Sequence, residues 1–336
     1  MNFFDSLWEA SGISACIDSV RETIGLSTSK VHKEEEIKPV KYMYRPQKLT
    51  EYIGQERAKD LVQLNLDKIK YLKPVHFIIS GCKGCGKTTL ANLIAKELDL
   101  EMFYQIGGVF TRENLIKFLA KNQDDKKRIY MLFIDEVHNL GKDLAEYLYP
   151  VLEDFILPEG KGLKLKPFIF VGATTEKNTL LQKFAPLVDR CGADIVLEQY
   201  KAEDIKQILK QYNDKLYRLN ITEEVYDLLA NNTRFTPRIA LAFFDDFIVC
   251  DNIKRVLDAH RVIKNGLTTT DIAILAHLKD VGKPVGIEAL ATVAGISRQD
   301  FQYVVEPYLL YNTYLSRTAR GRVLTSKGEL LLQELK

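Results

Sequence analysis

The chain has 336 residues, of which 46% are hydrophobic and 27% are charged, and its formal net charge is +2. This length allows two or three domains with full cores, and the nearly balanced charge means that any nucleic acid must bind to a local basic patch. The five cysteines are scattered along the chain, which argues against a disulfide framework. The sequence has no apolar run near 18 residues and no secretion signal, so we expect a cytoplasmic protein without a membrane span.

Residues 1–40 are predicted to be an N-terminal extension and linker. An apolar cluster begins the segment, Ile17, Val20 and Ile24 follow helical spacing, and a charged stretch covers residues 27–38. Two interpretations stay open: a helix that packs on the body of the protein, and a docking segment for an unknown partner.

Residues 41–200 alternate apolar runs with helical stretches. The runs at 75–80, 129–134 and 167–171 predict buried parallel strands, and this alternation is typical of a three-layer α/β domain. Residues 201–265 are predicted to be a small domain, helical throughout. Residues 266–336 are predicted to form short helices followed by a two-stranded ribbon that turns at Arg320 and Gly321.

The segment from residue 81 to residue 88 matches the phosphate-binding pattern G-x-x-x-x-G-K-[ST] between a predicted strand and a predicted helix. Its backbone N–H groups and the helix N-terminus favour phosphate, so ATP and Mg²⁺ are the expected cofactors. The residues expected to bind the nucleotide here are Gly81, Gly84, Gly86, Lys87, Thr88 and Thr89. The loop also contains the pair Cys82 and Cys85, which lacks the second pair of a zinc site; a redox role is the less favoured interpretation.

A strand that ends in Asp135 and Glu136 predicts the hydrolysis machinery. Asp135 would hold Mg²⁺ together with Thr88, and Glu136 would act as the general base for the attacking water. The strand at 168–171 leads to a hydroxyl that senses the γ-phosphate, with Thr175 favoured over Thr174. His138 is interpreted as a helix-start residue.

Two arginines are candidates for stabilising the charge of phosphoryl transfer. Arg190 lies in the sequence Pro-Leu-Val-Asp-Arg-Cys-Gly at residues 186–192, and Arg238 lies in a Thr-Pro-Arg sequence. By spacing alone, a surface ion pair is an equally good interpretation of each.

The motifs and their order resemble the RuvB family over residues 42–330. The C-terminal signature matters most, because P-loops are shared by many families. The matching segments are Arg45–Gln55, Gly81–Thr88, Phe133–His138, Gly172–Thr175, Leu187–Arg190, Thr236–Arg238, Glu306–Leu310 and Leu315–Arg322.

The resemblance implies an AAA+ P-loop ATPase with a parallel-sheet core, a small helical lid and a C-terminal winged helix, which forms hexameric rings and moves duplex DNA at Holliday junctions. It implies that Arg190 is an arginine finger for the neighbouring subunit and that Arg238 is the sensor arginine of the lid. By the same resemblance, Tyr52 and Ile53 touch adenine. The expected contacts to DNA phosphates are Arg317, Arg320 and Arg322.

Three departures from the family pattern are visible. Cys82 and Lys83 replace prolines of the P-loop, and Val188 replaces the first arginine of an L-R-x-R motif. Residues 153–167 are shorter than the hairpin with which the family docks its partner RuvA. These departures predict a divergent member that does not pair with RuvA in the usual way.

A DNA translocase is the leading hypothesis from the sequence. The alternative is an AAA+ clamp-loader or helicase-loader type ATPase with a partner other than RuvA, and sustained turnover by a homo-hexamer on DNA would separate the two. A third reading is a regulatory DNA-binding protein whose ATP site only controls oligomerisation, but such a protein needs neither Glu136 nor Arg190.

Overall fold

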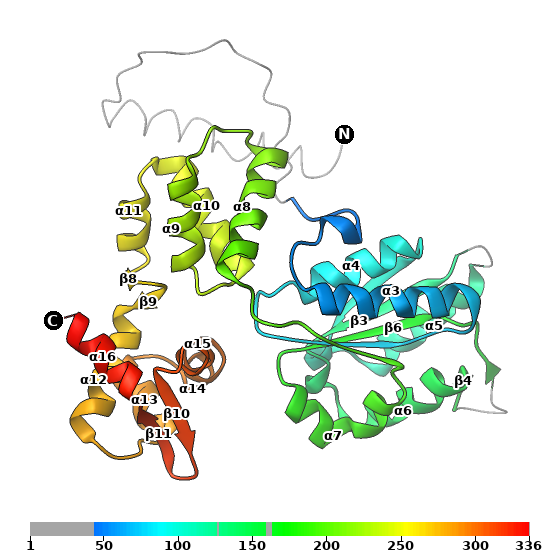
Figure 1. Cartoon of the computed structure of the whole chain (residues 1–336). Coiled ribbons are helices and arrows are strands. Elements are labelled where there is room, and N and C mark those ends of the chain that lie inside the picture. The colour runs from blue at the N-terminus through cyan, green and yellow to red at the C-terminus, as the bar shows by residue number, and fades with distance from the viewer. Residues whose placement is uncertain (1–43, 126–127, 159–162, 336) are drawn as a thin grey trace, which may run out of the picture. The chain divides into compact units, whose positions relative to one another are not determined.

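The computed structural model describes residues 44–125, 128–158 and 163–335 (Figure 1). The predicted helical segment near the N-terminus lies outside the described residues. Among the helices that are described, none combines the length and the apolar character that a membrane span requires.

Five parallel strands form the central sheet in the order β2-β3-β6-β1-β7. The three predicted strands are confirmed, although β6 extends three residues beyond the apolar run. The edge strands β2 and β7 were missed because neither is buried on both faces: the side chains of β7 alternate between buried and exposed, and those of β2 are all exposed or partly exposed. The strands are β1 (Phe77–Ser80), β2 (Glu101–Ile106), β3 (Tyr130–Asp135), β6 (Ile169–Thr174) and β7 (Ala193–Val196).

Helices cover both faces of this sheet, which confirms the three-layer α/β prediction. Successive side chains of a strand point to opposite faces, and in β1 Phe77 and Ile79 join one apolar cluster whereas Ile78 joins another. The first cluster includes helices α3 (Glu56–Tyr71) and α4 (Lys87–Glu97). The second includes α5 (Arg112–Asp124), α6 (Lys142–Glu153) and α7 (Lys177–Asp189).

A helical bundle follows the sheet and shares its first apolar cluster. It consists of α8 (Ala202–Leu216), α9 (Glu223–Asn232), α10 (Pro237–Cys250) and α11 (Ile253–Ala259). The prediction of helix throughout was wrong at its end, where β8 (Val262–Lys264) pairs with β9 (Leu267–Thr268). Asn265 and Gly266 adopt φ of 51° and 77°, and an Asn-Gly pair with positive φ turns a hairpin instead of extending a helix.

The C-terminal part has an apolar core of its own, built from short helices and a ribbon. The ribbon is confirmed, but its turn is Ala319-Arg320, because Gly321 already pairs with Thr318. Gly321 has a φ of 145°, and a Cβ on it would lie 2.4 Å from the carbonyl oxygen of Val285. The elements are α12 (Thr269–Val281), α13 (Ile287–Ala294), α14 (Arg298–Asp300), the π-helical turn η4 (Phe301–Val305), α15 (Glu306–Tyr311), β10 (Leu315–Thr318), β11 (Gly321–Leu324) and α16 (Ser326–Glu334).

Candidate nucleotide-binding and hydrolysis site

The predicted phosphate loop joins the carboxyl end of β1 to the first turn of α4. Gly84 and Gly86 adopt φ of 82° and 100°, a region that residues with a side chain rarely enter. The loop therefore curls at the N-terminus of α4, where the helix dipole and free N–H groups attract anions.

Lys87 supplies a buried positive charge to this loop. Its side chain donates to the carbonyl oxygens of Gly81 and Cys82, both at 3.0 Å, and the residue is only 7% exposed. Within the described parts of the chain, no carboxylate lies in ion-pair distance of its ammonium group. A buried ammonium without a counter-ion is unfavourable, so the site fits an anionic ligand such as a phosphate chain.

Asp135 and Glu136 lie at the end of β3, at the same edge of the sheet as the phosphate loop. Glu136 has a φ of 48° and a ψ of 51°, a conformation that costs energy for a residue with a side chain. Gly107 leaves room for it, because a Cβ at that position would lie 2.4 Å from the carbonyl oxygen of Glu136. The oxygens of Thr88 and Asp135 are the hard ligands that Mg²⁺ prefers.

The two threonines at the end of β6 have different surroundings. The N–H and hydroxyl groups of Thr175 both donate to Oε2 of Glu136, at 3.1 and 2.8 Å. Thr174 is fully buried, and its hydroxyl lies 2.9 Å from Nδ1 of His138. The structure thus brings Thr175, and not Thr174, into contact with the acidic end of β3.

His138 is part of a network that the sequence analysis did not find. It lies in the short turn η3 (Val137–Asn139), is buried, and has Nδ1 3.4 Å from Oε2 of Glu136 and Nε2 3.3 Å from Oε1 of Glu176. Burial raises the pKa of Glu176, but hydrogen bonds from Tyr303 and Thr179 and the charge of His138 outweigh it and leave this pKa below its usual value. In the sequence, the signal for this network was a histidine two residues after the acidic pair.

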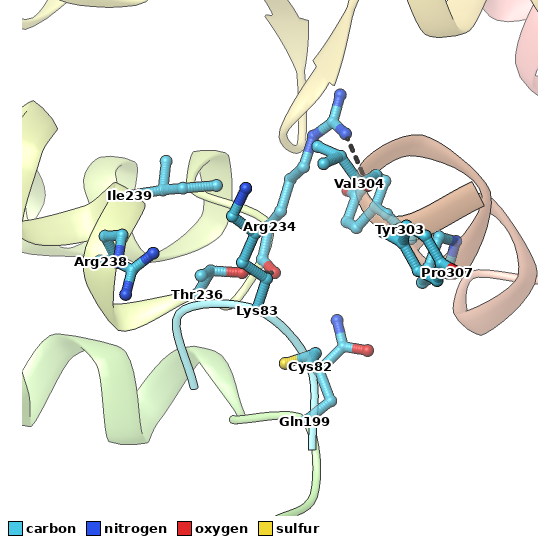
Figure 2. Close-up of a pocket in the computed structure, with 11 residues that line it drawn as sticks. Cys82, Lys83, Gln199, Arg234, Thr236, Arg238, Ile239, Tyr303, Val304 and Pro307 are labelled. Carbon is cyan, nitrogen blue, oxygen red and sulfur yellow. Dashed lines mark hydrogen bonds between the residues drawn. The ribbon is translucent and has the colours of Figure 1, made fainter. Parts of the chain in front are cut away.

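Arg238 meets the phosphate loop from the helical bundle. A Cβ on Gly84 would lie 3.1 Å from Cβ of Arg238 and 3.0 Å from Cγ2 of Thr236, so the start of α10 packs on the loop. Cys82, Lys83 and Arg238 line a pocket of about 270 Å³ (Figure 2). The structure therefore brings together two motifs that are about 150 residues apart in the sequence.

Tyr52 lies beneath the phosphate loop, whereas Ile53 is partly exposed. The Tyr52 hydroxyl is 3.5 Å from the carbonyl oxygen of Cys85 and 3.4 Å from that of Gly86, and the side chain is almost fully buried. Tyr52 thus supports the backbone of the loop, a contact that the resemblance to the family did not suggest.

Arg190 lies at the end of α7, away from these groups. Its guanidinium donates to the carbonyl oxygen of Pro186 at 2.7 Å, pairs with Glu153 at 2.7 Å, and lies 5.0 Å from the ring centre of Tyr149. Its Nε is buried and finds no hydrogen-bond partner within the part of the chain that the structure describes. Among the described residues, it makes no contact with the phosphate loop or the acidic pair of its own subunit.

The three predicted DNA-binding arginines differ in their contacts. Arg317 and Arg322 both bind the fully buried carboxylate of Glu306, with four hydrogen bonds between 2.7 and 3.2 Å. Burial raises the pKa of Glu306, but the two guanidinium groups outweigh it and leave this pKa below its usual value. Arg320 is exposed in the turn of the ribbon and forms no ion pair within the described residues.

These features define a P-loop ATPase of the AAA+ type that carries a winged helix. Two family models match the chain: the Holliday junction DNA helicase RuvB P-loop domain over residues 44–197, and the RuvB C-terminal winged helix domain over residues 264–333. The chain belongs to the RuvB family.

Individual relatives agree with this assignment. The chain is 35% identical over 308 residues to the Holliday junction branch migration complex subunit RuvB of Kosmotoga olearia, covering 84% of this chain and 88% of the relative. It is 33% identical over 333 residues to the subunit from Prochlorococcus marinus, covering 92% and 93%. The solved Holliday junction branch migration motor RuvB of Thermotoga maritima superposes with a TM-score of 0.73 at 31% identity, covering 86% of this chain and 98% of that structure.

Proposed function

We propose that this chain is an ATP-driven motor that moves duplex DNA at Holliday junctions during recombination and repair, as a homo-hexamer in the cytoplasm. One observation carries the proposal: Lys87, Glu136, Thr175 and Arg238 converge on one sheet edge in a chain that also matches the RuvB winged-helix model. The loader-type alternative is not favoured, since the relatives above are branch migration subunits.

The geometry supports a separate role for each of these residues within one subunit. Lys87 offsets the charge of the β- and γ-phosphates, and Glu136 accepts a proton from the attacking water. Thr175 holds Oε2 of Glu136 in place through two hydrogen bonds. Thr88 and Asp135 would hold Mg²⁺, which when bound offsets negative charge on the phosphates.

Two arginines complete the proposed machinery. Arg238 reaches the phosphate loop of its own subunit from α10, so the helical bundle moves with the state of the nucleotide. Arg190 acts on the ATP of the neighbouring subunit, and its pairing with Glu153 and Pro186 holds the guanidinium at the end of α7 until the ring assembles. An arginine that acts across subunits couples hydrolysis to the oligomer.

The partner that brings this motor to a junction is proposed to differ from RuvA, or to bind differently. In its described residues, the segment before β6 forms a small hairpin, in which β4 (Ile156–Leu157) pairs with β5 (Leu163–Lys164). Such short strands offer little surface to a partner. Residues 1–40, which the family does not usually carry at this length, are the proposed site for another partner.

The test is ATP-dependent dissociation of a synthetic four-way junction by the purified full-length protein, alone and with a RuvA added. We expect ATP-dependent dissociation without RuvA, and none from the Glu136→Gln variant. Dissociation only with RuvA would contradict the partner proposal but support the motor. No dissociation in either case, together with ATPase activity stimulated by plain duplex or primed DNA, would refute the motor and favour a loader.

A further inference from the structure

The phosphate loop of this chain contains two thiols that the proposed mechanism does not use. Cys82 is exposed and lines the pocket beside the loop, whereas Cys85 is fully buried beneath it. They are three residues apart, on either side of Lys83 and Gly84. Each thiol shifts the pKa of the other, so the two sulfur groups interact.

The backbone between them fits a disulfide without a large rearrangement. The N–H of Cys85 bonds to the carbonyl oxygen of Cys82 at 3.4 Å, which closes a four-residue turn. In such a turn the first and last Cα atoms are less than about 7 Å apart, and disulfides join Cα atoms roughly 4.4–6.8 Å apart. The turn therefore places the two thiols where a bond between them is sterically feasible.

The surroundings also favour a reactive Cys82. The hydrogen bond from Cys85 lowers the pKa of Cys82 to about 7, partial desolvation of the Cys82 sulfur by the surrounding loop opposes this shift, and the charge of Lys87 adds to it. The hydrogen bond to Cys82 and burial raise the pKa of Cys85. An exposed thiolate beside a protonated resolving thiol is the arrangement in which oxidation proceeds to a disulfide.

We propose that Cys82 and Cys85 form a reversible disulfide that weakens nucleotide binding, so that the phosphate loop is a redox-sensitive modification site. The inference rests on the proposed role of this loop in binding ATP. The oxidant class is a peroxide, and a dithiol reverses the reaction.

The chemistry balances with one peroxide for each disulfide. The Cys82 thiolate attacks an oxygen of hydrogen peroxide, so that an S–O bond forms, the O–O bond breaks, and hydroxide leaves and is protonated to water. The Cys85 sulfur then attacks the Cys82 sulfur; the S–S bond forms, the S–O bond breaks, and the departing hydroxide takes the proton of Cys85. Two thiols are oxidised and one peroxide is reduced to two waters.

The disulfide weakens nucleotide binding because the loop must tighten to form it. Cys85 cannot move far, since its side chain is fully buried in the core beneath the loop. Cys82 must therefore approach, and the bonded sulfurs end about 2.05 Å apart. The Cys82 carbonyl that holds Lys87 moves with it, and the N–H groups of the loop leave the positions that receive phosphate.

The experiment measures disulfide formation and ATP binding separately in the full-length protein. Peptide mass spectrometry detects the Cys82–Cys85 bond after hydrogen peroxide, and fluorescent MANT-ATP with Mg²⁺ reports binding before oxidation, after it, and after a dithiol. We expect at least a tenfold loss of affinity on oxidation, restored by the dithiol. By linkage, a tenfold loss means that saturating ATP, which binds the reduced protein more tightly, raises the reduction potential of the Cys82–Cys85 pair by about 30 mV.

Matched variants separate the loop thiols from the others, each compared with its own reduced state. Cys82→Ser should lose no affinity on oxidation, whereas Cys250→Ser, which keeps both loop thiols, should respond like the wild type. Three results would overturn the inference: no Cys82–Cys85 bond in the oxidised wild type, unchanged binding once the bond has formed, or an equal loss in Cys82→Ser. A reduced protein that binds no MANT-ATP would instead refute the proposed function, and the inference with it.

Discussion

Glu306→Gln tests whether a buried carboxylate holds the C-terminal ribbon against its domain. Glu306 is fully buried and accepts four hydrogen bonds from Arg317 and Arg322, which lie on the two ribbon strands. Glutamine is nearly the same size, but it is neutral and turns an N–H₂ group toward a guanidinium. Removing one member of a buried ion pair costs about 3–5 kcal/mol. We expect a loss of stability at the low end of this range, about 3 kcal/mol, because the Arg317 side chain is 54% exposed and its guanidinium can be hydrated once the carboxylate is gone.

Hydrogen exchange followed by mass spectrometry measures this loss locally. A change of about 3 kcal/mol corresponds to roughly 100-fold faster exchange through local opening, expected in peptides that cover residues 306–324. The backbone bonds between Val285 and Arg322 should lose protection together with the ribbon. Glu329→Gln, an exposed change on α16 of the same domain, is the control and should stay within about 0.5 kcal/mol. Less than about fivefold faster exchange in Glu306→Gln would refute the reasoning.

Four further predictions follow from the same structure. The effect of Glu306→Gln should shrink as the pH falls below 4.5, because the lowered pKa of Glu306 stabilises the fold only while the group is ionised; a constant difference between pH 7 and pH 3 in an equilibrium unfolding assay would contradict this. Glu136→Gln should slow ATP turnover by ~100-fold or more yet still bind ATP and trap an ATP-bound oligomer, and turnover equal to wild type would exclude Glu136 as the base. Arg190→Ala should be inactive alone but recover ATPase activity when mixed with Lys87→Ala, whereas verified mixed oligomers without activity would argue for a role within one subunit. Arg320→Ala should weaken duplex binding equally at all DNA sequences and reduce the slope of log affinity against log salt concentration by about one. An unchanged slope would remove Arg320 from the DNA contact surface.

Motifs made of residues close together in the chain could be recognised from the sequence, because they depend only on which residue types occur at which spacing. The phosphate loop needs glycines, a lysine and a threonine at set intervals between a strand and a helix, and all of these are local. The same holds for Asp135 and Glu136, which follow an apolar strand directly. The three interior strands were visible because burial on both faces leaves a continuous apolar run, whereas the edge strands β2 and β7 carry no such signal.

Contacts between distant segments were decided only by the tertiary structure. Glu136 meets Thr175 because β3 and β6 are parallel neighbours that end at one sheet edge, and Arg238 meets Gly84 because α10 packs on the loop. The pairing of Arg317 and Arg322 with Glu306 depends on how the ribbon folds over α15, so a pattern of arginines could not show that two of them are engaged. The sequence states which groups are available, but the packing of elements far apart in the chain determines which of them meet.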